Sequence, residues 1–71
     1  MANRPYYVLL LRQDVKSPWE VEFGDFSRDV VRAESQDKAF HYAGINRKII
    51  TTTEWQSDIN EAVRKLNADV K

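Results

Sequence analysis

The segment Trp19 to Val31, WEVEFGDFSRDVV, carries the clearest structural signal in this chain. Its first five residues alternate between apolar and acidic side chains, a period of two that predicts a half-buried β-strand over residues 19–23. The alternation stops at Gly24, and from Phe26 onward the apolar residues recur at helical spacing. The segment therefore predicts a strand that turns through a glycine directly into a helix.

Further strands are predicted on both sides of this segment. Residues 5–12 favour a pleated backbone and are apolar at nearly every position, which is typical of a strand in the middle of a sheet. Residues 45–52 include a β-branched run and predict a third strand. Turn-forming residues between positions 13 and 18 predict that the first two strands are antiparallel neighbours.

Two helices complete the expected secondary structure. The first is predicted over residues 27–43, with Asp25 or Ser27 as its N-cap and Gly44 as its C-cap. Thr53 and Gln56 match the capping box of a second helix. The residues that we expect in the core are alternate positions of the first strand together with Trp19, Val21, Phe23, Val30, Phe40, Trp55, Ile59, Val63 and Leu66.

The predicted fold class is α+β, with the element order ββαβα. A helix joins the second and third strands, which implies a crossover connection. The doubly apolar first strand then lies between them, giving a three-stranded mixed sheet in the order 2-1-3. We expect both helices to pack on one face of this sheet.

Length and composition indicate one small domain over residues 1–71, with frayed ends at residues 1–4 and 70–71. The 11 basic residues balance the 11 acidic ones, and this balance argues against a dedicated nucleic-acid protein. The longest apolar run, residues 6–11, is far too short for a membrane span. We therefore expect a soluble cytoplasmic protein that binds no membrane.

No motif in the sequence predicts catalysis, a cofactor or a metal. The chain has no cysteine and a single histidine, His41, which we interpret as a solvated or capping residue at a helix end. Asp25, Glu34 and Asp37 are acidic residues from which an acid–base pair could be assembled. Structural roles are the simpler interpretation for all three. The expected protein is not an enzyme and has no catalytic, cofactor-binding or metal-binding residues.

The first strand supplies the main candidate for a binding surface. With both helices on one face, one of its two alternating sets of apolar side chains would be exposed on the other, and an exposed apolar patch marks an interface. Such a patch has three explanations: a functional protein partner, a homodimer contact, or cover by long charged side chains. The candidate interface residues are Tyr6, Tyr7, Leu9, Leu10, Leu11, Glu20, Glu22 and Lys48.

Nucleic-acid binding is the alternative hypothesis. Tyr6 and Tyr7 lie beside Arg4 and Arg12 and could stack on bases, as aromatic residues on sheets do. Acidic residues on the neighbouring strand would repel phosphate. Arg28, Arg32 and Arg47 either form a modest basic patch or only balance Asp29 and Glu34, and the second is the default for a surface without net charge.

The run FGDFSRDVVRAE, residues 23–34, resembles a motif in small uncharacterised proteins of tailed phages and prophages. The shared features are the Phe-Gly-Asp turn, the aromatic Phe26, Arg28 and Glu34. The KIIT strand at residues 48–51 and the closing helix are similar as well. The resemblance implies an accessory phage protein and carries no assigned activity. Together with the composition, it predicts a non-enzymatic protein-interaction module that acts on a host protein or on a second copy of itself.

Overall fold

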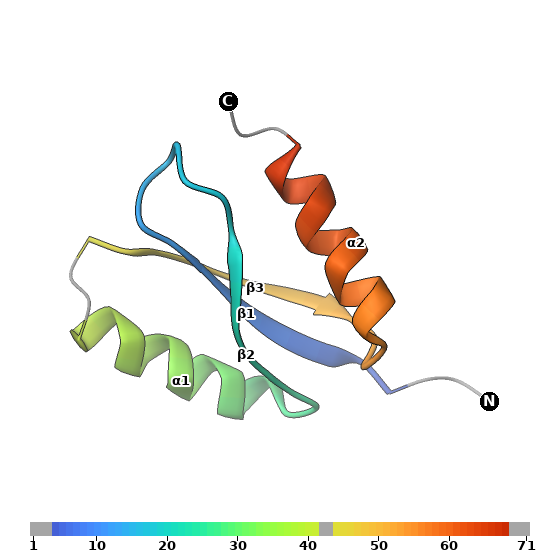
Figure 1. The fold of residues 1–71 in the computed structure, drawn as a ribbon. Coiled ribbons are helices and arrows are strands. Elements are labelled where there is room, and N and C mark those ends of the chain that lie inside the picture. The colour runs from blue at the N-terminus through green and yellow to red at the C-terminus, as the bar shows by residue number, and fades with distance from the viewer. Residues whose placement is uncertain (1–3, 42–43, 69–71) are drawn as a thin grey trace.

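Three strands form a single sheet with β1 in its centre (Figure 1). The computed structural model describes residues 4–41 and 44–68, and for residues 39–41 it describes the backbone alone. Its strands are β1 (Tyr6–Arg12), β2 (Glu20–Asp25) and β3 (Asn46–Thr52), in the order β2-β1-β3. The α+β class, the element order and the strand order are as predicted. Both pairings of β1 are antiparallel, so the sheet is antiparallel and not mixed.

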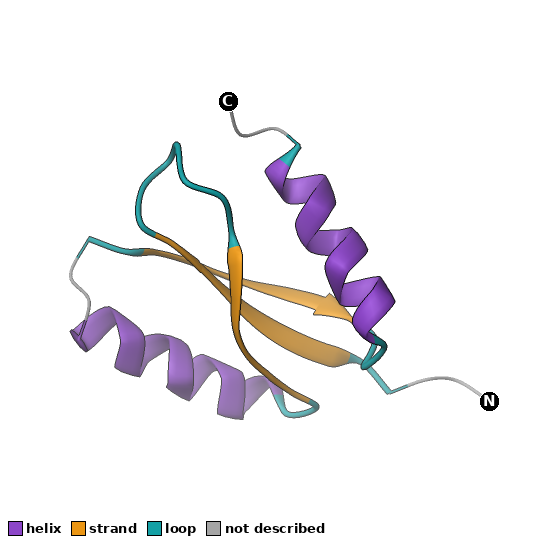
Figure 2. Cartoon of the chain, viewed as in Figure 1, coloured by secondary structure: helices purple, strands orange, loops and turns teal. Residues whose placement is uncertain are grey.

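The two helices, α1 (Arg28–His41) and α2 (Gln56–Asn67), cover opposite faces of this sheet (Figure 2). On one face, Val8 and Leu10 of β1 pack with Ile59 of α2. On the other face, Leu9 and Leu11 pack with Val31 of α1. The structure therefore has three layers, and the prediction that both helices pack on one face is wrong.

The composition of β1 gives the physical reason for this arrangement. Successive side chains of a strand point to opposite faces, and in β1 both sets are apolar. Each CH₂ left in water forgoes about 0.8 kcal/mol of burial free energy, so each face of β1 favours a helix of its own. Val8, Leu9 and Leu10 all have an exposed fraction of 0%.

The turn from β2 into α1 depends on a close contact between Gly24 and Tyr6. The Tyr6 ring lies so close over Gly24 that a Cβ atom at this position would be 2.6 Å from the tyrosine Oη. The same ring makes an edge-to-face contact with Phe26, with ring centroids 4.9 Å apart. Glycine is therefore required here by lack of space for a side chain, and Phe26 holds the tyrosine ring in place.

Asp25 and Ser27 both stabilise the start of α1, in different ways. The Asp25 Oδ1 atom accepts a hydrogen bond of 2.7 Å from the Ser27 backbone N–H. The Ser27 Oγ atom accepts a longer one, 3.4 Å, from the Val30 backbone N–H inside the first turn. Of the two predicted candidates, Ser27 is thus the N-cap of α1.

The start of α2 differs from its prediction. Trp55 occupies the N-cap position and makes no capping bond with its side chain, so the predicted capping box of Thr53 and Gln56 is wrong. The Thr53 hydroxyl instead donates to Asp58 Oδ2 at 2.5 Å and accepts from the Trp55 backbone N–H at 3.2 Å. The helix begins two residues later than the capping-box spacing indicates.

Three of the expected core residues lie at the surface. The exposed fractions are 50% for Val21, 45% for Val30 and 63% for Trp55. Val21 lies on an edge strand, and Trp55 precedes the helix whose apolar stripe it was expected to join. Ile59 is buried as predicted, and Trp19, Phe23, Val63 and Leu66 pack against the two clusters. The side chains of Phe40 and His41, and residues 1–3 and 70–71, lie outside the described residues.

Candidate functional site

The structure does not leave a face of β1 open, so the predicted apolar interface is wrong in its central residues. Leu9 and Leu10 have no exposed surface, and Leu11 is 8% exposed. Leu9 and Leu11 lie under α1, and Leu10 lies under α2. These three side chains form the core because each sheet face has its own helix.

The two candidate tyrosines are half-buried on opposite faces of the sheet. Tyr6 belongs to the cluster under α2, and its ring is held between Gly24 and Phe26. Tyr7 belongs to the cluster under α1. The Arg4 guanidinium lies 4.6 Å from the centre of the Phe26 ring, so it already stacks within the protein. The tyrosines therefore do not form a common platform for stacking bases.

The charged members of the predicted interface lie at opposite edges of the sheet. Glu20 and Glu22 are on β2, whereas the exposed Lys48 is on β3, and β1 separates them. Glu22 forms an ion pair of 3.2 Å with Lys38 of α1, which also lies 3.7 Å from Glu34. The three charged residues do not frame one surface.

The predicted basic patch lies between α1 and β3. Arg28 and Arg32 are exposed and one helical turn apart on α1. Arg47 is exposed on β3, and its Nη1 donates to the backbone oxygen of Ser35 at 3.1 Å and to its hydroxyl at 3.0 Å. Because Ser35 follows Arg32 by three positions on the helix, the bond holds Arg47 beside this part of α1.

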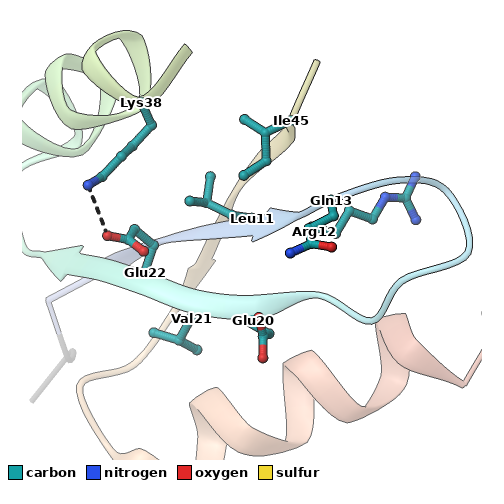
Figure 3. Close-up of a pocket in the computed structure, with 8 residues that line it drawn as sticks. All are labelled: Leu11, Arg12, Gln13, Glu20, Val21, Glu22, Lys38 and Ile45. Atoms are coloured by element: carbon teal, nitrogen blue, oxygen red, sulfur yellow. Dashed lines mark ion pairs between the residues drawn. The ribbon is translucent and has the colours of Figure 1, made fainter. Parts of the chain in front are cut away.

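A cavity of about 400 Å³ opens near the end of β1, beside β2 and α1 (Figure 3). The described residues that line it are Leu11, Arg12, Gln13, Glu20, Val21, Glu22, Lys38 and Ile45. The ionisable side chains of the described lining are those of Arg12, Glu20, Glu22 and Lys38, and none of the described lining residues carries a hydroxyl, thiol or imidazole group. The Glu22–Lys38 pair neutralises two of its charges, and the Arg12 guanidinium lies 4.3 Å from the centre of the Trp19 ring.

The groups with shifted pKa values are Asp14, in the turn that follows the cavity-lining Gln13, and the Glu61–Arg64 pair on α2. The Lys16 backbone N–H and the Ser17 hydroxyl donate to Asp14 and lower the pKa of its carboxyl group. On α2, the side-chain hydrogen bond from Arg64 lowers the pKa of Glu61. The same hydrogen bond raises the pKa of Arg64. Within the described ranges, no three metal-ligating side chains cluster together, and neither helix has the length and apolar character to cross a membrane.

The two edges of the sheet differ in how well they are protected against pairing with another strand. The pairing of β2 with β1 shifts register between Leu9 and Leu10, so Glu22 has no partner in the ladder. This irregularity, Gly24 and two glutamates all discourage strand addition at the β2 edge. Native proteins use such features to prevent edge-to-edge association.

The β3 edge has little of this protection. All seven residues of β3 pair with β1 in unbroken register, and in the described chain β1 is the only strand hydrogen-bonded to it. Four consecutive β-branched residues, 49–52, favour the extended conformation, and β3 contains neither proline nor glycine. Only Arg47 and Lys48 place charge on it. The predicted strand order already placed this strand at an edge, but the sequence analysis sought a binding surface on the sheet face and not along its edge.

Comparison with known proteins found no matching family model and no significant match among curated proteins or solved structures.

Proposed function

We propose that this protein is a non-enzymatic protein-interaction module that takes up an extended chain segment along the free edge of β3. The observation that carries the proposal is the contrast between an irregular, acidic β2 edge and a regular, β-branched β3 edge. A free edge presents a row of unpaired backbone N–H and C=O groups, and an added strand satisfies them. The class of function is the one expected from the sequence, and the binding surface moves from the sheet face to its edge.

The resemblance of residues 23–34 to phage and prophage proteins supports an accessory role in the cytoplasm of an infected bacterium. The proposed partner class is a protein that offers an extended segment, either a host protein or a second copy of this chain. Nucleic-acid binding through the exposed Arg28, Arg32 and Arg47 is the competing possibility, and the experiment below separates the two. Phosphate contacts would weaken steeply as the salt concentration rises.

The proposal is tested by capture from a bacterial lysate with two proline variants of β3, Thr51→Pro and Thr52→Pro. Because backbone bonding alternates along an antiparallel strand, one of the two residues bonds to β1 and the other faces outward. The variant that keeps the native circular dichroism spectrum is the outward one, and it lacks one edge N–H. We expect this variant to lose a stoichiometric protein partner that the unmodified protein retains after nuclease treatment.

The matched control is Val21→Lys on the β2 edge, where the side chain is 50% exposed. It should capture the partner as well as the unmodified protein does. Equal capture by the folded proline variant, or equal loss in the Val21→Lys control, would exclude β3 as the binding edge. Material that disappears on nuclease treatment would instead support nucleic-acid binding.

A further inference from the structure

We infer that the segment which β3 takes up is β3 of a second copy of this chain, paired antiparallel about a two-fold axis near Ile50. This inference rests on the proposed function of the β3 edge and names one occupant for it. In this register, Lys48 of one copy lies opposite Thr52 of the other. The product is a six-stranded sheet in the order β2-β1-β3-β3-β1-β2.

The protection of the edges favours this closed pair. A two-fold contact uses the same surface on both copies and so buries both β3 edges at once. It leaves the two β2 edges at the outside of the sheet, each with its register shift and its glutamates. The irregular edges then oppose further strand addition, and the assembly ends at two copies.

The charges along β3 are self-complementary under the same two-fold axis. Arg47 and Lys48 lie at the start of the strand, and the exposed Glu54 lies two residues beyond its end. An antiparallel pair brings the basic start of each strand beside the acidic end of the other. Opposite charges across strands stabilise the pair, whereas a parallel arrangement would set like charges side by side.

Trp55 adds an apolar group at the same end of β3. Its side chain is 63% exposed and makes no capping bond for α2. Three residues span at most about 11 Å, so Trp55 lies near the end of β3, next to Glu54. In the antiparallel pair, this end meets the Arg47–Lys48 start of the second copy, where an aromatic ring attracts a cation. Exposed tryptophans are also frequent anchors of protein interfaces.

Two charge-reversal variants test the inference, and sedimentation velocity of the purified full chain over a concentration series is the measurement. The unmodified protein should form a reversible dimer. In Lys48→Glu each contact between copies becomes acidic on both sides, and in Glu54→Lys each becomes basic on both sides. We expect each variant alone to dimerise about tenfold more weakly or worse, because two favourable pairs become repulsive.

An equimolar mixture of the two variants should recover the dimer, because each contact between unlike copies again joins opposite charges. The matched control pair is Lys16→Glu and Glu20→Lys. These exposed residues lie away from β3 and give the same changes from the native net charge of 0. Each control variant should dimerise alone as the unmodified protein does.

A protein that stays monomeric throughout the series would overturn the inference. So would a dimer that both β3 variants leave intact, or a mixture that recovers no better than its components. A monomer that still captures a β3-dependent partner from lysate would leave the proposed function standing and exclude the second copy as the occupant. A dimer that captures nothing else would identify self-association as the use of this edge.

Discussion

The side-chain amide of Asn67, near the end of α2, binds both backbone polar groups of Trp19, 48 positions earlier in the chain. The Trp19 N–H donates to Asn67 Oδ1 at 2.6 Å, and Asn67 Nδ2 donates back to the Trp19 carbonyl oxygen at 3.2 Å. A carboxamide can make this reciprocal pair because it carries one acceptor and one donor side by side. The contact ties the last turn of α2 to the residue that precedes β2.

Asn67→Ala should lower the free energy of unfolding by about 1–3 kcal/mol, because it leaves two partly buried backbone groups without partners. Urea unfolding followed by circular dichroism measures the change. The control is Asn60→Ala on the same helix, which removes only an exposed bond from Gln56 and should cost less than about 0.5 kcal/mol. Equal losses in the two variants would show that the Trp19 contact adds nothing to stability.

Gly24→Ala should destabilise the protein by about 1–3 kcal/mol, because the new methyl group would force the Tyr6 ring out of its place. The ring has little freedom to move because it packs against Phe26. Combining the change with Tyr6→Leu tests the mechanism. In that background Gly24→Ala should cost clearly less, so a double-mutant cycle measured by thermal unfolding should show coupling. Strict additivity would disprove the steric explanation.

Leu9→Ala and Leu10→Ala should each lower the free energy of unfolding by about 2–5 kcal/mol, since each leaves a cavity in a different half of the core. If one face of β1 were open, only one of the two changes would be costly. Chemical denaturation of the two variants therefore tests the three-layer arrangement directly. The matched control is Val15→Ala, at an exposed position in the turn after β1, and it should have little effect on the free energy of unfolding.

Asp14 should contribute to the stability of the β1–β2 turn only in its charged form. Hydrogen bonds from the Lys16 N–H and the Ser17 hydroxyl lower its pKa below the ordinary value of 3.8. A carboxyl group with a lowered pKa in the folded state stabilises the fold above the unfolded-state pKa, and this contribution is lost as the pH falls through the folded-state value. An NMR titration of the Asp14 carboxyl carbon should give a midpoint below 3.8.

The variant Asp14→Asn isolates this titration, because the amide oxygen can still accept the Lys16 bond and carries no titrating proton. Between neutral pH and pH 2, the unmodified protein should lose more stability than the variant does. If the free energy of unfolding falls equally with decreasing pH in the two proteins, or if the carboxyl midpoint lies at or above 3.8, the role assigned to Asp14 is contradicted.

Local periodicity was enough to predict most of the secondary structure. The alternation that starts at Trp19, the apolar run of β1 and the stripe containing Ile59 all reflect contacts that repeat along one element. The strand order also followed, because a doubly apolar strand belongs in the middle. The side of the sheet that α2 covers was not local information. The two apolar sets of β1 required cover on both faces, and the prediction of one covered face overlooked this requirement.

The candidate site was less predictable, for a related reason. The hypothesis of an exposed apolar face assumed that both helices lay together, so it failed when α2 took the other side and buried Leu10. Trp55 was placed on the apolar stripe by spacing alone, and spacing does not show where a helix begins. The edge position of β3 followed from the predicted strand order, but its contrast with the β2 edge depends on the register shift between Leu9 and Leu10, which the sequence does not show.

The position of β1 between two apolar layers has a further consequence for how this protein finds its native pairing. In a strand with one polar face, a slip of one residue would expose the apolar set, and hydrophobicity alone forbids it. In β1 both sets are apolar, so a strand slipped by one residue would still bury apolar side chains on each face. The Tyr6 ring over Gly24 opposes a slip in one direction, because that slip would put Pro5 in the place of Tyr6 and would lose the ring contacts with Gly24 and Phe26. The glycine thus opposes slips of the central strand in one direction only, since Tyr7 could take the place of Tyr6 in the other.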